Sequence, residues 1–311
     1  MLHRFQMRAP HTAILAATLA AAALVVLPGV TGADTLPVDI ELILAVDVSL
    51  SMDPEEQRLQ RDGYVEALRD ADVLAAIRAN AMGRIGVVYV EWAGAATQKV
   101  TVPWAVIDGP VTAATFTDRL ALAPIMRAQR TSISGALEFS GRLFDSSGFK
   151  GKRRVIDVSG DGPNNDGGPV TVVRDKLVGQ GITINGLPVM LKAATGWFDL
   201  ENLDQYYEDC VIGGFAAFSI PARNKIEFAK AIKRKLLLEI AETRPAPGLP
   251  LVRIQASGSP GSGEPPASGP LPNSPLPNSP LPSAREPGGR VDCLIGEKRW
   301  NQYMGGRRGT F

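Results

Sequence analysis

Short apolar runs alternate with amphipathic helical segments along the chain between Asp34 and Thr243. Several runs are apolar at nearly every position, which is typical of strands buried on both faces of a sheet. Strands that alternate with helices predict a mainly parallel sheet with helices on both faces. We therefore expect a doubly wound α/β domain with six strands, at Glu41–Val46, Ile85–Trp92, Lys99–Trp104, Val155–Ser159, Ile182–Met190 and about Val211–Ile220.

Helical periodicity separates most of these strands. It predicts helices at Pro54–Leu68, Ser132–Phe144, from near Pro169, and at Asn224–Thr243. The runs Ile85–Trp92 and Lys99–Trp104 are too close for a crossover helix. They should form a hairpin, which gives the sheet one antiparallel edge strand.

The N-terminus has the pattern of a secretory signal peptide. Arg4 and Arg8 precede an apolar run at Ala13–Leu27, and a small-residue stretch ends at Ala33. A retained membrane anchor is the alternative, but the apolar run is shorter than the ~20 residues that a spanning helix needs. We expect residues 1–33 to be removed, which leaves an exported protein, periplasmic or secreted, without a transmembrane segment.

Export would change the composition of the chain. Both histidines, His3 and His11, would be lost, and removing Arg4 and Arg8 leaves 31 of the 33 basic residues against 32 acidic ones. The resulting charge near −1 gives no reason to expect nucleic acid as a partner. Without histidine, Ser-His-Asp and Cys-His catalysis and His-ligated metal sites are excluded.

Cys210 and Cys293 are the chain's two cysteines. In an oxidising compartment such a pair most simply forms a disulfide, and two unpaired buried thiols are the alternative. Between them, residues 244–289 form a predicted Pro/Gly/Ser-rich linker after the domain at 34–243, and Pro245–Pro287 holds 13 of the 24 prolines. A disulfide would tie the tail, residues 290–311, back to the domain.

Oxygen-bearing side chains follow the first predicted strand. Asp47, Ser49 and Ser51 alternate along an extended loop, so they can point the same way. Ligands bind at the carboxyl ends of strands in such sheets, and an all-oxygen set suits Mg²⁺, Mn²⁺ or Ca²⁺. Asp53 followed by Pro54 offers a simpler reading, the start of a helix.

Two further loops should reach the same edge of the sheet. Thr131 lies at the start of the helix before the fourth strand, and Asp161 directly follows that strand. Thr131 could be only a helix cap and Asp161 only a turn residue. Five oxygen-bearing residues on three loops at one edge nevertheless favour a cation site.

At these positions the sequence resembles the von Willebrand factor A domain, whose metal-ion-dependent adhesion site reads D-x-S-x-S, then Thr, then Asp. Leu50 replaces the commoner Gly between the serines. Three segments are similar to a bacterial exported branch of this fold whose function is unknown. They are Val155–Asn165 (VIDVSGDGPNN), VEWAG near Glu91 and DCVIGG at Asp209. The resemblance covers about 36–243 plus the Cys293 region. It implies a Rossmann-like six-stranded fold and non-catalytic, metal-dependent binding.

The resemblance assigns the five residues a shared role. Asp47, Ser49, Ser51, Thr131 and Asp161 would hold a divalent cation, most simply Mg²⁺, through which the module captures a carboxylate of a partner protein. Two alternatives are a structural domain with an unused metal site and a metal-dependent hydrolase. No P-loop or D-x-D-x-[TV] element supports the hydrolase.

Four other residues are candidates to support the site or to face a partner. Asp157 lies within a buried strand and is either a hydrogen-bonded core carboxylate or a support for the ligands. Asn164 and Asn165 follow Asp161 closely and should form turns beside the metal face. Trp197 lies in the loop after the fifth strand, where either core packing or a partner contact is expected.

Overall fold

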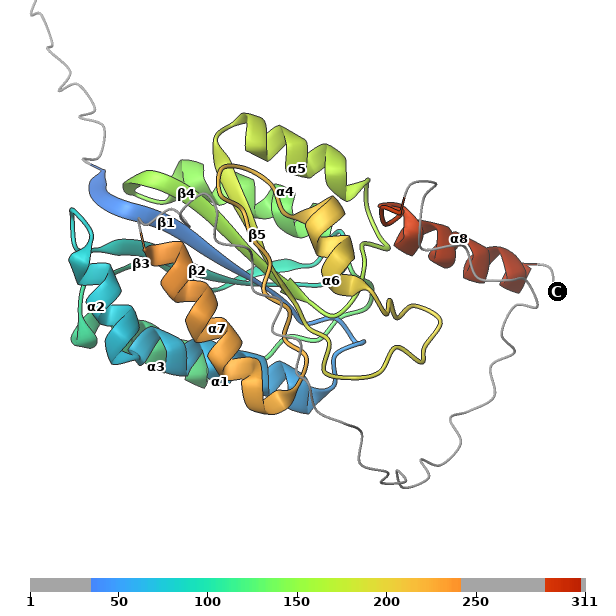
Figure 1. Ribbon diagram of the computed structural model, residues 1–311, viewed down its shortest axis with the longest axis horizontal. Coiled ribbons are helices and arrows are strands. Elements are labelled where there is room, and N and C mark those ends of the chain that lie inside the picture. Colours follow the sequence, from blue (N-terminus) through green and yellow to red (C-terminus); the bar gives the residue numbers. More distant parts are fainter. Residues whose placement is uncertain (1–34, 242–288, 309–311) are drawn as a thin grey trace, which may run out of the picture. The chain divides into compact units, whose positions relative to one another are not determined.

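The structure is a computed structural model that describes residues 35–241 and 289–308 (Figure 1). The predicted signal peptide, residues 1–33, lies outside these ranges. The predicted linker, 244–289, lies outside them except for its last residue. Within the described residues, none of the helices is long and apolar enough to cross a membrane.

Five strands form one sheet in the order β3-β2-β1-β4-β5. All neighbours are parallel except β2 and β3, which pair antiparallel, so the predicted antiparallel edge strand is confirmed. The strands are β1 (Leu36–Asp47), β2 (Ile85–Trp92), β3 (Gln98–Ile107), β4 (Phe149–Gly160) and β5 (Ile182–Pro188).

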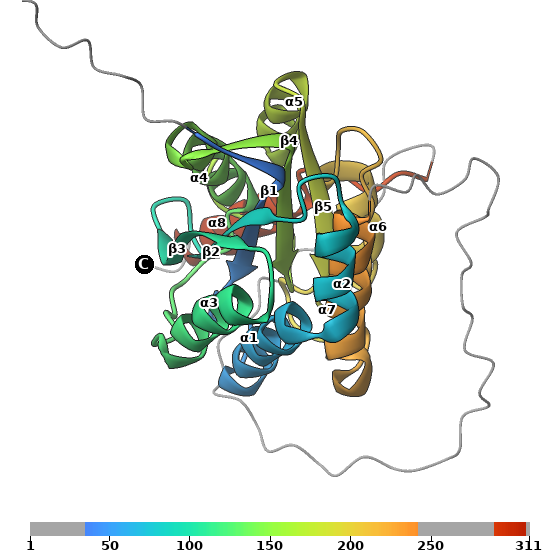
Figure 2. The same cartoon turned by 90° about the vertical axis from the view of Figure 1, so that its left-hand side faces the viewer.

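Helices cover both faces of the sheet (Figure 2). One face carries α1 (Pro54–Arg69), α2 (Ala71–Ala79), α3 (Pro110–Leu122) and α7 (Lys225–Ile240). The other carries α4 (Ile133–Leu143), α5 (Val170–Gly179) and α6 (Leu203–Tyr206), with a short 3₁₀ turn at Phe144–Ser146 and a π-helical turn at Tyr207–Val211. Every residue of β2 is buried, as a strand between two helical layers should be. The doubly wound α/β class is confirmed.

The prediction of a sixth strand at Val211–Ile220 was wrong. Val211 ends the π-helical turn, and the following residues touch β5 only through isolated bridges such as Ile184 with Gly213 and Gly186 with Ser219. Gly214 and Ala216 have φ of 96° and 56°, and two left-handed residues so close together prevent a continuous extended ladder.

The sheet reverses its winding direction between β1 and β4. From β1 the chain adds β2 and β3 on one side, then returns to place β4 and β5 on the other. At such a switch point the loops after the two central strands separate, which leaves a crevice at the carboxyl edge. Two of the three predicted ligand loops follow these two strands, and the third, with Thr131, directly precedes α4.

The tail forms helix α8 (Ile295–Arg308). The predicted disulfide between Cys210 and Cys293 is confirmed. A second link lies beside it, because the backbone N–H of Val291 donates to Asp209 Oδ2 at 2.9 Å. The segment directly before α8 is therefore held to the π-helical turn at two points.

Candidate metal site at the carboxyl edge of the sheet

Four of the five predicted ligands form one hydrogen-bonded chain. The backbone N–H of Ser49 donates to Asp47 Oδ1 at 2.7 Å. The hydroxyl oxygens of Ser49 and Ser51 lie 2.8 Å apart. Ser51 Oγ donates to Asp161 Oδ1 at 2.7 Å. The loops after β1 and β4 thus bring two carboxylates and two hydroxyls together.

The helix-start interpretation of the first loop is also correct, but it uses other residues. Asp53 Oδ1 accepts hydrogen bonds from the backbone N–H groups of Glu55 and Glu56, each at 2.8 Å. The Glu56 side chain accepts from the Asp53 backbone at 2.9 Å, which completes a capping box. The cap of α1 therefore leaves Asp47, Ser49 and Ser51 for another role.

Leu50 directs its side chain to solvent. It is 47% exposed, and its backbone N–H donates to Ala128 O at 2.9 Å. Its φ is not in the left-handed region. Replacement of the commoner glycine therefore places no side chain inside the site and introduces no backbone strain.

Thr131 precedes the cap of α4 and is not the cap itself. Ser132 Oγ accepts from the Gly135 N–H at 3.1 Å and performs that role. The Thr131 backbone instead pairs with Asn165, donating to its Oδ1 at 2.9 Å and accepting from its N–H at 2.8 Å. A Cβ added at Gly162 would lie 4.0 Å from Thr131 Oγ1, so this hydroxyl faces the turn that follows Asp161.

The two aspartates are destabilised as anions. Burial, and then the nearby Asp161 carboxylate, raises the pKa of Asp47 well above its ordinary value. Burial raises the pKa of Asp161 to about 6, opposed mainly by the hydrogen bond from Ser51. Buried like charges of this kind favour a bound cation or a bound proton.

The second carboxylate oxygen of Asp47 is relevant to cation binding. Among the described residues, the buried Asp47 Oδ2 has no hydrogen-bond partner. A Cβ at Gly160 would lie only 2.9 Å from it, so the absence of a side chain there keeps the space beside this oxygen. The donor set and this orphaned oxygen fit a hard divalent cation.

A third acid near this edge is already neutralised. Glu91, on β2, forms a buried ion pair with Arg61 on α1 and accepts from the Met126 N–H at 3.2 Å. In the described part of the chain, no group of three or more His, Cys, Asp or Glu side chains is placed to hold a metal. A cation here would depend on two carboxylates with hydroxyl and water ligands.

Sequence reasoning missed Lys192, which lies in the loop after β5. Its Nζ is 3.3 Å from Asp53 Oδ2 and also pairs with Glu56. It lines a cavity of about 410 Å³ together with Ser51, Asp161 and other residues. The rule that ligands bind at the carboxyl ends of strands identified the loops after β1 and β4. Applied to polar residues after β5, the same rule would have identified Lys192.

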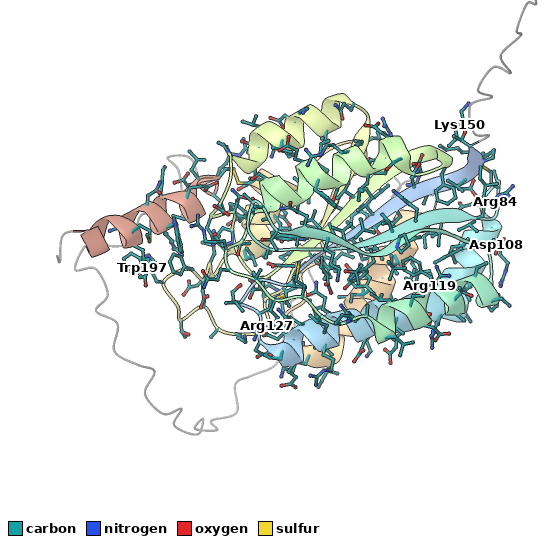
Figure 3. All side chains as sticks on the ribbon, turned by 180° about the vertical axis from the view of Figure 1, so that it is seen from behind. Arg84, Asp108, Arg119, Arg127, Lys150 and Trp197 are labelled. Carbon is teal, nitrogen blue, oxygen red and sulfur yellow. A yellow bond between two sulfur atoms is a disulfide. The ribbon has the colours of Figure 1, made fainter. Side chains whose placement is uncertain are left out.

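Asp157, Asn164 and Trp197, which were predicted to support the site or to face a partner, lie in three different parts of the fold. Asp157 lies in the core on the α1 and α7 side, where it pairs with Lys235 and accepts from Tyr64 at 3.4 Å. Asn164 is fully buried, so it does not face a partner. Trp197 is half-buried beside α8, and its Nε1 donates to Arg299 O at 3.3 Å (Figure 3).

A family model described as "Protein of unknown function (DUF1194)" matches residues 37–244. The chain belongs to this family, as the resemblance to a branch of unknown function predicted. None of the curated proteins matches the chain.

Solved structures with von Willebrand factor A features resemble the chain at low identity. Proximal thread matrix protein 1 from the mussel byssus is 13% identical with a TM-score of 0.47, over 66% of this chain and 49% of that one. A structure of that protein with a zinc-occupied MIDAS motif is 14% identical with a TM-score of 0.45, over 66% and 48%. A von Willebrand factor type A protein from Catenulispora acidiphila is 10% identical with a TM-score of 0.46, over 65% and 43%. The chain spans at most about half of each, and such likenesses carry no information on function.

Proposed function

We propose that this chain is an exported, non-catalytic binding module that captures an acidic group of a partner protein through a divalent cation. The ligands, direct or through water, are Asp47, Ser49, Ser51, Thr131 and Asp161. Mg²⁺ fits an all-oxygen set of this size, with Mn²⁺ and Ca²⁺ as alternatives.

The observation that carries this proposal is the burial of the Asp47 carboxylate without a counter-charge in the described part of the chain. It is fully buried, and its Oδ2 has no hydrogen-bond partner among the described residues. It also lies close enough to Asp161 for the second carboxylate to raise its pKa. An arrangement of this kind is costly without a counter-charge, and a divalent cation would supply one.

The charge balance explains how such a site could bind a partner. Two aspartates neutralise a dication, while hydroxyl groups and water add ligands without charge. The ion would keep Lewis acidity and an exchangeable position that a partner's carboxylate could fill. The cavity of about 410 Å³ that Ser51 and Asp161 line offers a route of approach.

Binding is favoured over hydrolysis by the side chains available. No histidine occurs after His11, and Lys192 is engaged by Glu56 and Asp53. A hydrolase would need a general base within reach of a metal-bound water. A structural domain with an unused site is the other alternative, and cation titration distinguishes it from a binding module.

Export is supported by the signal-like pattern of residues 1–33 and by the disulfide. Disulfides persist mainly in oxidising compartments. The periplasm and the extracellular medium both meet this condition.

The test is capture by the immobilised oxidised protein from the envelope and medium of the exporting cell, in Mg²⁺ and in EDTA. Wild type, Asp47→Ala and Asp118→Ala are run in parallel. Asp118 is a matched control because its exposed carboxylate pairs with Arg69, at the opposite end of α1 from the site.

We expect a partner that binds wild type and Asp118→Ala in Mg²⁺ only. Converting the partner's carboxylates to amides should abolish its capture, because the cation would lose its anionic ligand. Capture that persists in EDTA or with Asp47→Ala removes the proposed role of the site.

A further inference from the structure

Helix α8 contacts three loops at the edge of the sheet that holds the candidate site. These are the Arg130–Thr131 segment, the turn that contains Asn164, and the loop from Trp197 to Asp199. The first two contain or adjoin proposed cation ligands. A tail helix that served only to bury apolar surface would not need hydrogen bonds to two of these loops and a cation–π contact with the third.

Asn164 is the central connection. Its Nδ2 donates to Glu297 Oε1 on α8 at 2.7 Å, and its Oδ1 accepts from the Ser134 N–H in the first turn of α4 at 2.9 Å. The adjacent Asn165 pairs with the backbone of Thr131 in both directions. The same Nδ2 also donates to Asp166 O at 3.2 Å and to Gly168 O at 3.1 Å. The shorter bond to α8 therefore helps to hold the carboxamide that supports the start of α4, next to the Thr131 ligand.

Gly296 allows α8 to approach this turn closely. A Cβ at position 296 would lie 2.0 Å from Asn164 O and 2.8 Å from its carbonyl carbon. Both are backbone atoms, so no side-chain rotation could relieve the clash. Any larger residue at this position would have to move α8 away from Asn164.

Trp300 provides a second connection, to the residue before Thr131. The Arg130 guanidinium lies 3.7 Å from the centre of the Trp300 ring and pairs with Asp166 at 2.8 Å. Arg130 has a φ of 74°, a left-handed conformation that is costly for a side-chain-bearing residue. Such a conformation persists when surrounding contacts hold it, and Trp300 and Asp166 provide those contacts.

The third connection reaches the wall of the cavity. Arg299 Nη1 donates to the backbone oxygen of Asp199, and Asp199 lines the cavity beside Ser51 and Asp161. The Phe198 ring packs on Trp300 and Tyr303, with centroids 5.5 Å and 5.4 Å apart. The helix thus also sets the position of the loop past which a partner would approach.

We infer that α8 positions the loops of the metal site, with Gly296 and Glu297 as positioning residues that act through Asn164 on Thr131. This inference rests on the proposed function, because the property it predicts is cation affinity. Mutation of residues that support metal ligands by hydrogen bonds typically lowers metal affinity about 10–100-fold.

The experiment compares the full oxidised protein with Gly296→Val, Glu297→Ala and the control Gly305→Val. Gly305 lies on the same helix, and a Cβ there would meet nothing within 4 Å. Calorimetry measures Mn²⁺ affinity, and hydrogen exchange without cation follows the amides of Thr131 and Ser134. Melting temperatures are recorded for all four proteins. Glu297→Ala is the variant that keeps helix propensity, since alanine is the strongest helix former.

We expect Gly296→Val and Glu297→Ala each to weaken Mn²⁺ binding about tenfold and to speed exchange at both amides. Glu297→Ala should do so with a nearly unchanged melting temperature, which a purely structural role would not produce. Gly305→Val should match wild type. Wild-type affinity and exchange in both variants would overturn the inference.

The two proposals fail in different ways. Wild-type protein that binds no Mn²⁺ contradicts the proposed function, whatever the variants do. In that case the exchange measurement alone tests the inference, because the Thr131 and Ser134 N–H groups donate to Asn165 Oδ1 and Asn164 Oδ1 without a cation. Faster exchange in Gly296→Val sustains the positioning role of α8, and unchanged exchange removes it.

Discussion

The Ser51 hydroxyl donates a 2.7 Å hydrogen bond to Asp161, 110 positions further along the chain. This bond joins the loop after β1 to the loop after β4, on either side of the point where the sheet reverses its winding. It also brings two of the proposed cation ligands within hydrogen-bond distance of each other. The site is therefore assembled by the topology of the sheet and does not depend on a local sequence segment alone.

Ser51→Ala should weaken Mn²⁺ binding about tenfold, which corresponds to about 1.4 kcal/mol. The loss is moderate because water can replace a neutral hydroxyl ligand. The free energy of unfolding should stay within about 0.5 kcal/mol of wild type, because Ser51 is exposed. Calorimetry and urea titration measure the two quantities. Ser146→Ala, another exposed serine, is the control, and an unchanged affinity in Ser51→Ala would remove Ser51 from the ligand set.

Asp157→Asn should alter the pH dependence of stability. Burial and then the Glu239 carboxylate raise the pKa of Asp157 to about 7, against the opposing effects of Lys235 and Tyr64. A carboxyl group whose folded-state pKa is raised stabilises the fold below its unfolded pKa, and that contribution is lost as the pH rises through about 7. The amide cannot ionise, so the variant should gain stability relative to wild type between pH 5 and 8. Urea titrations across this range measure the difference, and a constant difference would contradict the assignment.

Replacing Cys210 and Cys293 together by serine should destabilise the protein by about 4–5 kcal/mol in the chain-entropy model. The reason is that the disulfide restricts the unfolded chain over a sequence separation of 83. Urea unfolding of the double variant and the oxidised wild type measures this difference. Two alkylatable thiols in the purified wild-type protein without reductant would show that the bond does not form.

Much of the fold follows from local sequence patterns. The apolar runs predicted the positions of β1 to β5, and the short gap between Trp92 and Lys99 predicted the antiparallel pair. The sequence pattern failed at Val211–Ile220, because the left-handed conformations of Gly214 and Ala216 cannot be recognised from an apolar run. It also omitted α2 and α3, two of the helices that cover one face.

The candidate site was predictable in part, because two of its residues lie at the ends of predicted strands. Asp47 ends β1 and Asp161 directly follows β4. Because ligands bind at the carboxyl ends of strands in such sheets, the sequence predicted that the two residues lie together. Thr131 was weighed as a cap, but Ser132 takes that role, and only the three-dimensional arrangement distinguishes adjacent hydroxyl residues. The contact between Gly296 and Asn164 spans a long stretch of chain and depends on a close backbone approach, which leaves no periodic signal in the sequence.

Calorimetry of Mn²⁺ binding to wild type, Asp47→Ala and Asp118→Ala measures whether Asp47 holds a divalent cation. Asp47→Ala removes a charged ligand and leaves Asp161 alone to neutralise a dication, so binding should be lost. The variant should still fold, because it removes a fully buried carboxylate whose pKa is raised by burial and then by the nearby Asp161. We predict one Mn²⁺ site in wild type and in Asp118→Ala, and none in Asp47→Ala. Equal Mn²⁺ affinity in wild type and Asp47→Ala would contradict the account.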